Sequence, residues 1–117
     1  MIVKLAENLI RVKRLRLNDF EPENQDALAY YDVILGEIVI RKDLKPSVFW
    51  HALKHEVVHA YGFLFDVPEL RGDDEKSERL VGSVANLLDI YIIGNRDLIL
   101  KRWKDYDSLK KELEVKG

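Results

Sequence analysis

The chain has 117 residues, of which 47% are hydrophobic, so we expect one globular domain over residues 1–117 with a single modest core. The formal net charge is −2, which gives no general attraction to nucleic acid or acidic membranes, and no apolar run approaches the roughly 20 residues of a membrane span. The absence of cysteine excludes disulfides and cysteine-based zinc sites, so any metal has to be held by His, Asp or Glu. Because the N-terminus also lacks the pattern of a signal peptide, we expect a cytoplasmic protein with neither nucleic acid nor membrane as a partner.

The N-terminal part of the chain predicts two short strands. Residues 2–5 form an apolar segment, and residues 9–17 alternate apolar and basic side chains, with a change of phase near Arg14 that suggests a bulge. The basic side chains of the second strand could form a nucleic-acid patch. The acidic overall charge and the lack of interleaved aromatic residues favour a solvated strand face instead.

A hairpin followed by a helix is predicted for the middle of the chain. Two β-rich runs, 28–34 and 37–41, flank a glycine-containing turn, which is typical of an antiparallel hairpin. The helix is expected to start at Pro46 with Ser47 as its N-cap and to stop at Gly62. The strand that precedes the helix either presents a free edge to an extended peptide or is an ordinary interior strand, and the sequence favours neither alternative.

The motif H-E-x-x-H at residues 55–59 lies inside this predicted helix. Residues four apart on an α-helix differ by about 40° of rotation and about 6 Å of rise, so His55 and His59 leave the same face and can share one metal ion. Glu56 lies beside that face, where its carboxylate can take a proton from a water activated by zinc. The alternative is a chance match with hydrogen-bonded core histidines. All three histidines of the chain lie within nine residues, which favours the metal site.

A second helix, capped by Asp73 or Asp74, is expected to supply the third ligand. One row of this helix carries Glu78 together with the small or short residues at 81, 82 and 85, which would let it approach the motif helix closely. Gly82 costs of order 1 kcal/mol in a helix interior, and a close approach would explain its presence. We favour Glu78 as the ligand and keep Glu75, one turn earlier, as the alternative, because acids in a first turn are also favoured by the helix dipole.

The last part of the chain predicts a charged helix over residues 97–115, in one or two pieces with a break near residues 105–108. One of its faces carries residues that could pack on the rest of the domain: Leu98, Ile99, Arg102, Trp103 and Tyr106. The expected fold is therefore α+β. A small antiparallel or mixed sheet of about four strands packs against the motif helix, the glutamate helix and a C-terminal helix.

An H-E-x-x-H motif followed some twenty residues later by a glutamate on a second helix resembles the gluzincin arrangement of zinc metallopeptidases. Over about residues 1–98, the order of short strands, hairpin, motif helix and Glu-Arg-Leu helix is similar to the compact ImmA/IrrE-type peptidases. The resemblance implies a zincin-like fold, a zinc ion held by His55, His59 and Glu78, and Glu56 as the catalytic carboxylate. The chain departs from the larger members after Glu78, where it has Arg-Leu-Val-Gly instead of Ala-Asn-x-Phe.

We therefore expect a small zinc endopeptidase that acts on a protein or peptide substrate, with Glu56 as general base and then general acid. The residue that stabilises the oxyanion is left open among five candidates: Tyr30, Tyr31, His51, Tyr61 and Tyr91. The alternative function is a non-catalytic, zinc-stabilised protein-binding module, in which a fourth protein ligand such as Glu75 or His51 would close the site.

Overall fold

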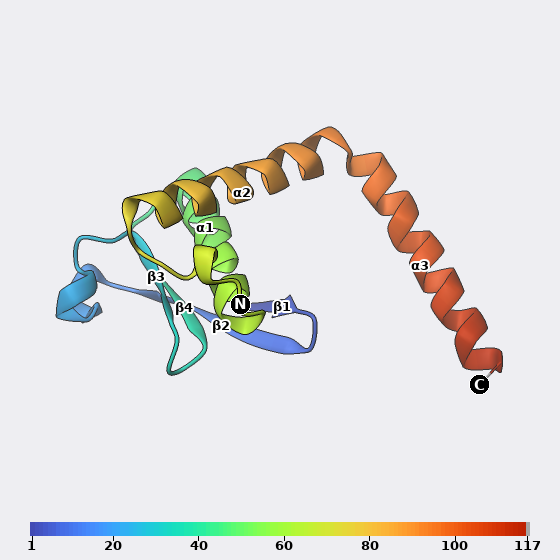
Figure 1. Ribbon diagram of the computed structural model, residues 1–117, viewed down its shortest axis with the longest axis horizontal. Coiled ribbons are helices and arrows are strands. Elements are labelled where there is room, and N and C mark those ends of the chain that lie inside the picture. The colour runs from blue at the N-terminus through green and yellow to red at the C-terminus, as the bar shows by residue number, and fades with distance from the viewer. Residues whose placement is uncertain (117) are drawn as a thin grey trace. The chain divides into compact units, whose positions relative to one another are not determined.

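Four strands form one mixed sheet in the order β1-β2-β4-β3 (Figure 1). The computed structural model describes residues 1–116, except for the side chains of residues 109, 115 and 116. The strands are β1 (Ile2–Leu5), β2 (Asn8–Leu15), β3 (Ala29–Asp32) and β4 (Glu37–Arg41). The α-helices are α1 (Pro46–Leu64), α2 (Glu75–Gly94) and α3 (Arg96–Lys116). The short 3₁₀ helices are η1 (Leu17–Asp19), η2 (Pro22–Asn24) and η3 (Pro68–Leu70). The fold is thus α+β, as expected from the sequence.

The chain divides into two compact units, Met1–Ala85 and Asn86–Gly117. Every buried side chain of the described residues belongs to the first unit, so the hydrophobic core lies there. Among the described residues, no helix is both long enough and apolar enough to cross a membrane.

The core lies between the sheet and α1. Strand β2 alternates as its sequence predicts and turns Ile10 and Val12 inward, while Ile38 and Ile40 of β4 lie beside them. Against these strands pack the apolar residues of α1: Phe49, Ala52, Leu53 and Ala60. Burial of this kind is worth about 1.5–3 kcal/mol for each large apolar side chain, so this layer holds α1 in place on the sheet.

The basic side chains of β2 find partners on neighbouring elements. Arg11 and Lys13 form ion pairs of 3.5 Å and 3.2 Å with Glu37 of β4. The guanidinium of Arg14 lies over the ring of Phe49, 4.5 Å from its centroid. Three of the basic side chains of this strand therefore contribute to packing and pairing within the first unit.

The register corrects one prediction about the strands and decides between two alternatives that the sequence left open. β2 pairs in parallel with β4 without interruption from Arg11 opposite Glu37 to Leu15 opposite Arg41, so the bulge predicted near Arg14 is absent. β4 lies between β2 and β3, so the strand before the helix is an interior strand and not the free edge. The edge on this side of the sheet is β3, which the hairpin turn places outside β4.

The helix ends also differ from the predicted ones at two of three positions. Pro46 occupies the first turn of α1 and makes Lys45 the N-cap, so Ser47 is not the cap. α1 continues through Gly62 and ends at Leu64, so Gly62 does not terminate the helix; it lies where α1 contacts Leu70. Asp74 caps α2 as predicted, with its Oδ1 accepting a hydrogen bond of 2.8 Å from the Ser77 amide. α3 runs without the break predicted at residues 105–108.

Two glycines of the helices have opposite surroundings. A Cβ atom at Gly62 would lie 2.7 Å from the Cβ of Leu70 and 3.0 Å from its carbonyl carbon, so α1 and η3 meet too closely for any side chain. A Cβ atom at Gly82 would meet nothing within 4 Å, so the close approach proposed for Gly82 is wrong. The approach of α2 to α1 depends instead on Val81 and Ala85, which are buried with Val58 and Leu70.

We predict that Gly62→Ala and Gly82→Ala change the free energy of unfolding in opposite directions. Gly62→Ala forces η3 away from α1 and should cost about 1–3 kcal/mol. Gly82→Ala removes the conformational freedom of glycine from an open helical site and should stabilise by up to about 1 kcal/mol. Urea unfolding of the two variants, with a chelator present, measures both changes. Equal effects of the same sign would contradict the assignment of Gly62 to the contact with η3.

Candidate metal centre

Two histidines and one carboxylate converge between α1 and the first turn of α2. The rings of His55 and His59 leave the same face of α1 with their centroids 5.0 Å apart. Nε2 of His55 lies 2.7 Å from Oε2 of Glu78, and Nε2 of His59 lies 2.9 Å from Oε1 of the same carboxylate. One ligand atom from each residue lies within 4.8 Å of the others, which is close enough for a single cation. The structure thus brings together the three ligands expected from the sequence.

The position of Glu78 follows from the packing of α2. The Asp74 cap starts the helix, and the backbone amide of Glu78 donates to the Asp74 carbonyl at 2.9 Å. One and two turns further on, Val81 and Ala85 are buried against Val58 of α1 and against Leu70. Glu78 lies on the same side of α2 as these two anchors, because residues three and seven apart share a helix face. Apolar packing therefore aims the carboxylate at the histidines.

The hydrogen bond made by Nδ1 of His59 indicates that the site favours a bound cation. Its Nδ1 lies 2.8 Å from the carbonyl oxygen of Leu70. Since a carbonyl oxygen only accepts, Nδ1 carries the hydrogen, and in the neutral ring Nε2 presents a lone pair. This lone pair faces Oε1 of Glu78 at 2.9 Å, so two acceptors meet unless a proton or a metal cation lies between them. Two imidazole nitrogens and a carboxylate suit zinc, and a carbonyl behind one histidine is the usual support of such a ligand.

The alternative ligands are not brought to this cluster. The side chain of Glu75 is 89% exposed and pairs with Arg79 at 3.1 Å on the surface of α2. His51, one turn before His55, lines a hollow next to the site, but it is not part of the group whose ligand atoms converge. Among the described residues, the converging set therefore has three protein ligands, which leaves a position for water or substrate.

Glu56 lies beside the cluster as a buried acid. The residue is only 8% exposed, and no described residue forms a hydrogen bond or ion pair with its carboxylate. The pKa of Glu56 is raised from 4.5 to about 7, mainly because its carboxyl is buried; His59 opposes this rise, and the nearby Glu78 adds to it. A carboxylate with a pKa close to neutrality is well suited to take up a proton and then release it.

Two hollows flank the cluster, and both are bounded by β3 and by Glu56. The larger, of about 550 Å³, is lined by His59, Tyr30, Tyr31, Phe63 and Arg71 among others. The smaller, of about 260 Å³, is lined by His51, His55 and Ala29 among others. Of the five oxyanion candidates, Tyr30, Tyr31 and His51 line a hollow of the centre, whereas Tyr61 lines neither and Tyr91 belongs to the second unit.

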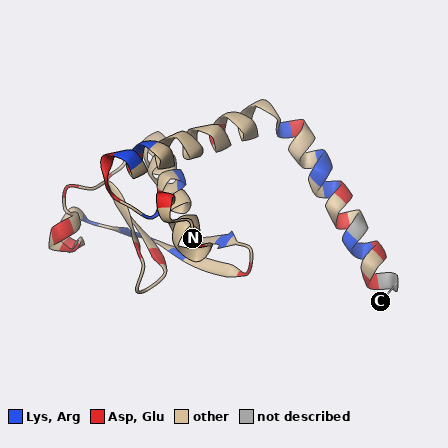
Figure 2. Ribbon diagram, viewed as in Figure 1, with Lys and Arg blue, Asp and Glu red and all other residues tan. Residues whose placement is uncertain are grey.

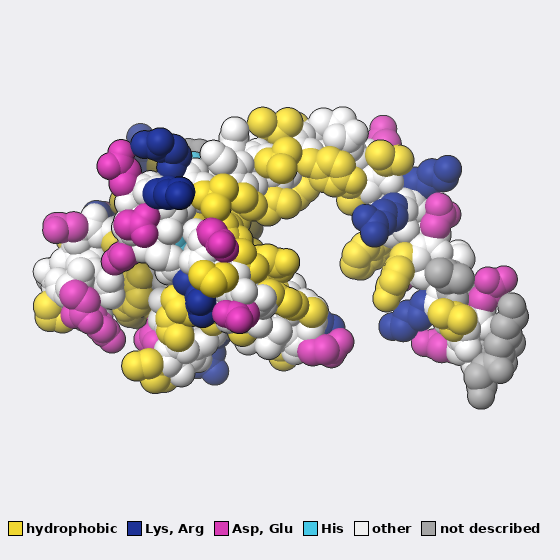
Figure 3. Space-filling view, viewed as in Figure 1, with side chains coloured by type: hydrophobic (Ala, Val, Ile, Leu, Met, Phe, Trp, Pro, Cys, Tyr) yellow, Lys and Arg dark blue, Asp and Glu magenta, His cyan; other side chains and the backbone are white. Residues whose placement is uncertain are grey.

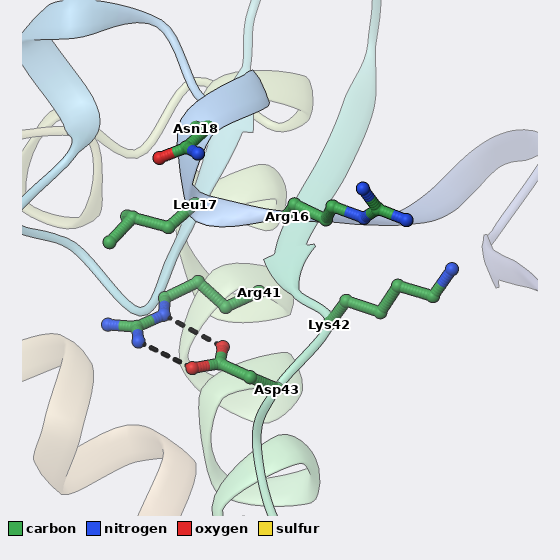
Figure 4. Close-up of a pocket in the computed structure, with 6 residues that line it drawn as sticks. All are labelled: Arg16, Leu17, Asn18, Arg41, Lys42 and Asp43. Carbon is green, nitrogen blue, oxygen red and sulfur yellow. Dashed lines mark hydrogen bonds and ion pairs between the residues drawn. The ribbon is translucent and has the colours of Figure 1, made fainter.

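A third hollow, of about 360 Å³, lies where β2 and β4 end and has none of the metal ligands in its lining (Figure 4). In it Arg41 and Asp43 pair through two hydrogen bonds of 3.0 Å and 2.7 Å, so the one carboxylate of this hollow is already held by a guanidinium. The side chains of Arg16 and Lys42 extend away from this pair into solvent (Figure 4). We assign no chemistry to this hollow.

No family model, curated protein or solved structure matches the chain. Its function has to be argued from the centre itself. Sequence reasoning missed two participants, the Leu70 carbonyl and the edge strand β3. A backbone acceptor leaves no mark in a sequence, and the order of strands decides which one becomes the edge.

We predict that the chain binds one zinc ion and that Glu78 and Glu75 differ in their contribution. Glu78→Gln replaces the charged ligand with a neutral amide and should weaken zinc binding by at least about 100-fold. Even substitutions of residues that only hydrogen-bond to a metal ligand lower metal affinity by about 10–100-fold. Glu75→Gln, its control one turn away, should leave the affinity unchanged. Competition with a chromophoric chelator measures both. A loss with Glu75→Gln and none with Glu78→Gln would overturn the assignment.

We also predict a pH dependence of stability that is caused by Glu56. Its pKa in the folded chain, about 7, lies above the unfolded value of 4.5, so the folded state holds the proton more tightly. The free energy of unfolding should therefore fall as the pH rises through this interval, by about 3 kcal/mol in total. Glu56→Gln should flatten this slope. Urea unfolding across the interval, with a chelator present, measures it, and identical slopes for the two proteins would contradict the prediction.

Proposed function

We propose that the chain is a zinc-dependent peptidase, an endopeptidase of gluzincin type similar to the ImmA/IrrE-like enzymes. One observation carries the proposal: a three-ligand centre adjoins a buried carboxylate to which no described residue is hydrogen-bonded, and both border a hollow open to solvent. A metal site that served only to hold the fold would need neither Glu56 nor an open position. This separates the proposal from a zinc-stabilised binding module.

The chemistry divides between the metal and the residues. When bound, zinc acts as a Lewis acid that polarises the scissile carbonyl and lowers the pKa of water towards neutrality. His55, His59 and Glu78 hold it, and the bond from His59 to Leu70 fixes the tautomer that binds. Glu56 takes the proton of the attacking water and passes it to the leaving amine nitrogen as the peptide C–N bond breaks. Its raised pKa suits both transfers at neutral pH.

The free edge of β3 supports a peptide as the substrate. β3 pairs only with β4 in the sheet, so its outer backbone groups are available to an extended chain. Ala29 of β3 borders both hollows, which together flank the metal ligands. A peptide bound along this edge would pass the cluster with side chains on either side of the scissile bond.

We predict that Glu56→Gln keeps zinc and loses hydrolysis. The amide cannot accept the proton of water, and general acid–base catalysis of this kind contributes about 10²–10⁴-fold to the rate. Elemental analysis measures the zinc content, and release of fluorescent fragments from a labelled, denatured protein measures cleavage. Glu75→Gln serves as the control and should retain both. Full hydrolysis by a zinc-loaded Glu56→Gln protein would overturn the mechanism.

A further inference from the structure

The second unit carries apolar side chains that nothing within it covers. Six large hydrophobic side chains between Leu87 and Ile93 of α2, and five between Leu98 and Leu113 of α3, are each between 43% and 74% exposed. None of the described side chains from Asn86 onward is buried. In the space-filling view, hydrophobic side chains follow this part of α2 and recur along α3 (Figure 3). Helical stability in proteins comes mainly from packing of an apolar face, so these helices require a partner surface.

The exposed apolar area is large enough for a stable interface. Eleven side chains of this size and exposure offer on the order of 1,000 Å² in total around the two helices, so an interface of the standard size, roughly 800 Å² per partner, would use most of them. The largest apolar patch of an ordinary monomer is about 300–600 Å². On α3, Trp103, Tyr106 and Leu113 lie on one face, at spacings of three and seven. Tryptophan and tyrosine are the residues that most often anchor such contacts.

The charges of α3 indicate which partner fits. Residues 96–104 contain four basic side chains and one acid, a net charge of +3, whereas residues 105–116 contain four acids and three lysines, a net charge of −1. Figure 2 shows the mixed charges of α3 beside the nearly uncharged second half of α2. Two copies of α3 side by side in opposite directions would place the half with a net charge of +3 of each copy against the half with a net charge of −1 of the other, and would keep the two halves of net charge +3 apart. The helix dipoles would also be opposed.

We propose that the chain forms a homodimer through Asn86–Lys116, with the two α3 helices antiparallel around a two-fold axis. A two-fold interface uses the same surface on both copies, so the surface has to complement itself, and α3 does so in charge. An acidic membrane surface would attract residues 96–104 with their net charge of +3 but not residues 105–116 with their net charge of −1, whereas a second copy of α3 engages both halves. The dimer does not depend on the proposed peptidase activity, since none of the metal ligands takes part.

The first test measures the mass of the full chain by sedimentation equilibrium. We expect about twice the 13.7 kDa of one chain. Trp103→Lys should dissociate the dimer. The matched control Trp50→Lys changes the other exposed tryptophan, on α1 (53% exposed, against 66% for Trp103), and should leave the dimer intact. Far-UV circular dichroism and zinc content check the fold of both variants. A wild-type chain that remains monomeric at about 100 µM, a concentration 100-fold above a Kd of about 1 µM, would overturn the proposal. A monomer that binds acidic vesicles would overturn it as well.

The second test reverses charges to probe the direction of the helices. Arg102→Glu with Lys104→Glu makes the first half of α3 acidic, so an antiparallel dimer should weaken by about tenfold or more. Adding Glu112→Lys and Glu114→Lys to the same chain makes the second half basic and should restore it. In a parallel dimer, the first pair of changes would relieve the repulsion between two basic halves and strengthen association. Stronger association of the double variant, or no recovery in the quadruple variant, would therefore overturn the antiparallel arrangement.

Discussion

The hydrogen bond from His59 Nδ1 to the Leu70 carbonyl is the constraint on which the centre depends. It fixes which nitrogen of His59 faces Glu78, and it requires η3 to lie directly against α1. That contact exists only because residue 62 has no side chain. Leu70 in turn forms the apolar cluster in which Val81 and Ala85 of α2 are buried, and their packing aims Glu78. One backbone carbonyl thus connects the ring orientation, the helix contact and the position of the third ligand.

The burial of Glu56 beside Glu78 costs electrostatic free energy, which a bound cation would offset. Glu56 is buried, and this burial, with a smaller contribution from the nearby Glu78, raises the pKa of its carboxyl, so the ionised form of Glu56 is disfavoured in the folded chain. A cation bound to the folded chain alone would stabilise it in proportion to the logarithm of its concentration over Kd. The electrostatic cost of burying Glu56 beside Glu78 is therefore one that a bound cation would reduce.

Much of the centre could be predicted from the sequence, because it depends on local periodicity. The spacing of His55 and His59 and the row of α2 that carries Glu78 follow from 3.6 residues per turn, and the structure brings these three side chains together. The Asp74 cap and the β3–β4 hairpin follow from local rules as well. Features that depend on tertiary contacts could not be read in this way. In the sequence Gly62 has the pattern of a helix C-terminus, but in the structure it allows the close contact of α1 with Leu70. The pairing of β2 with β4 makes β4 an interior strand and leaves β3 at the edge of the sheet.

The parallel pairing of β2 with β4 has a consequence for the order in which the chain folds. β1–β2 and β3–β4 are hairpins between neighbouring segments, and α1 is local, so each can form early and independently. Only the β2–β4 pair joins the two hairpins, and its strands are more than twenty residues apart. The entropy of closing that long loop is lost before the contacts of the shared core form. Pairing of β2 with β4 is therefore expected to be the slow step of folding. We therefore expect Val12 and Ile38, which meet across this junction, to govern the rate of folding, while the residues around the metal ligands govern mainly the rate of unfolding.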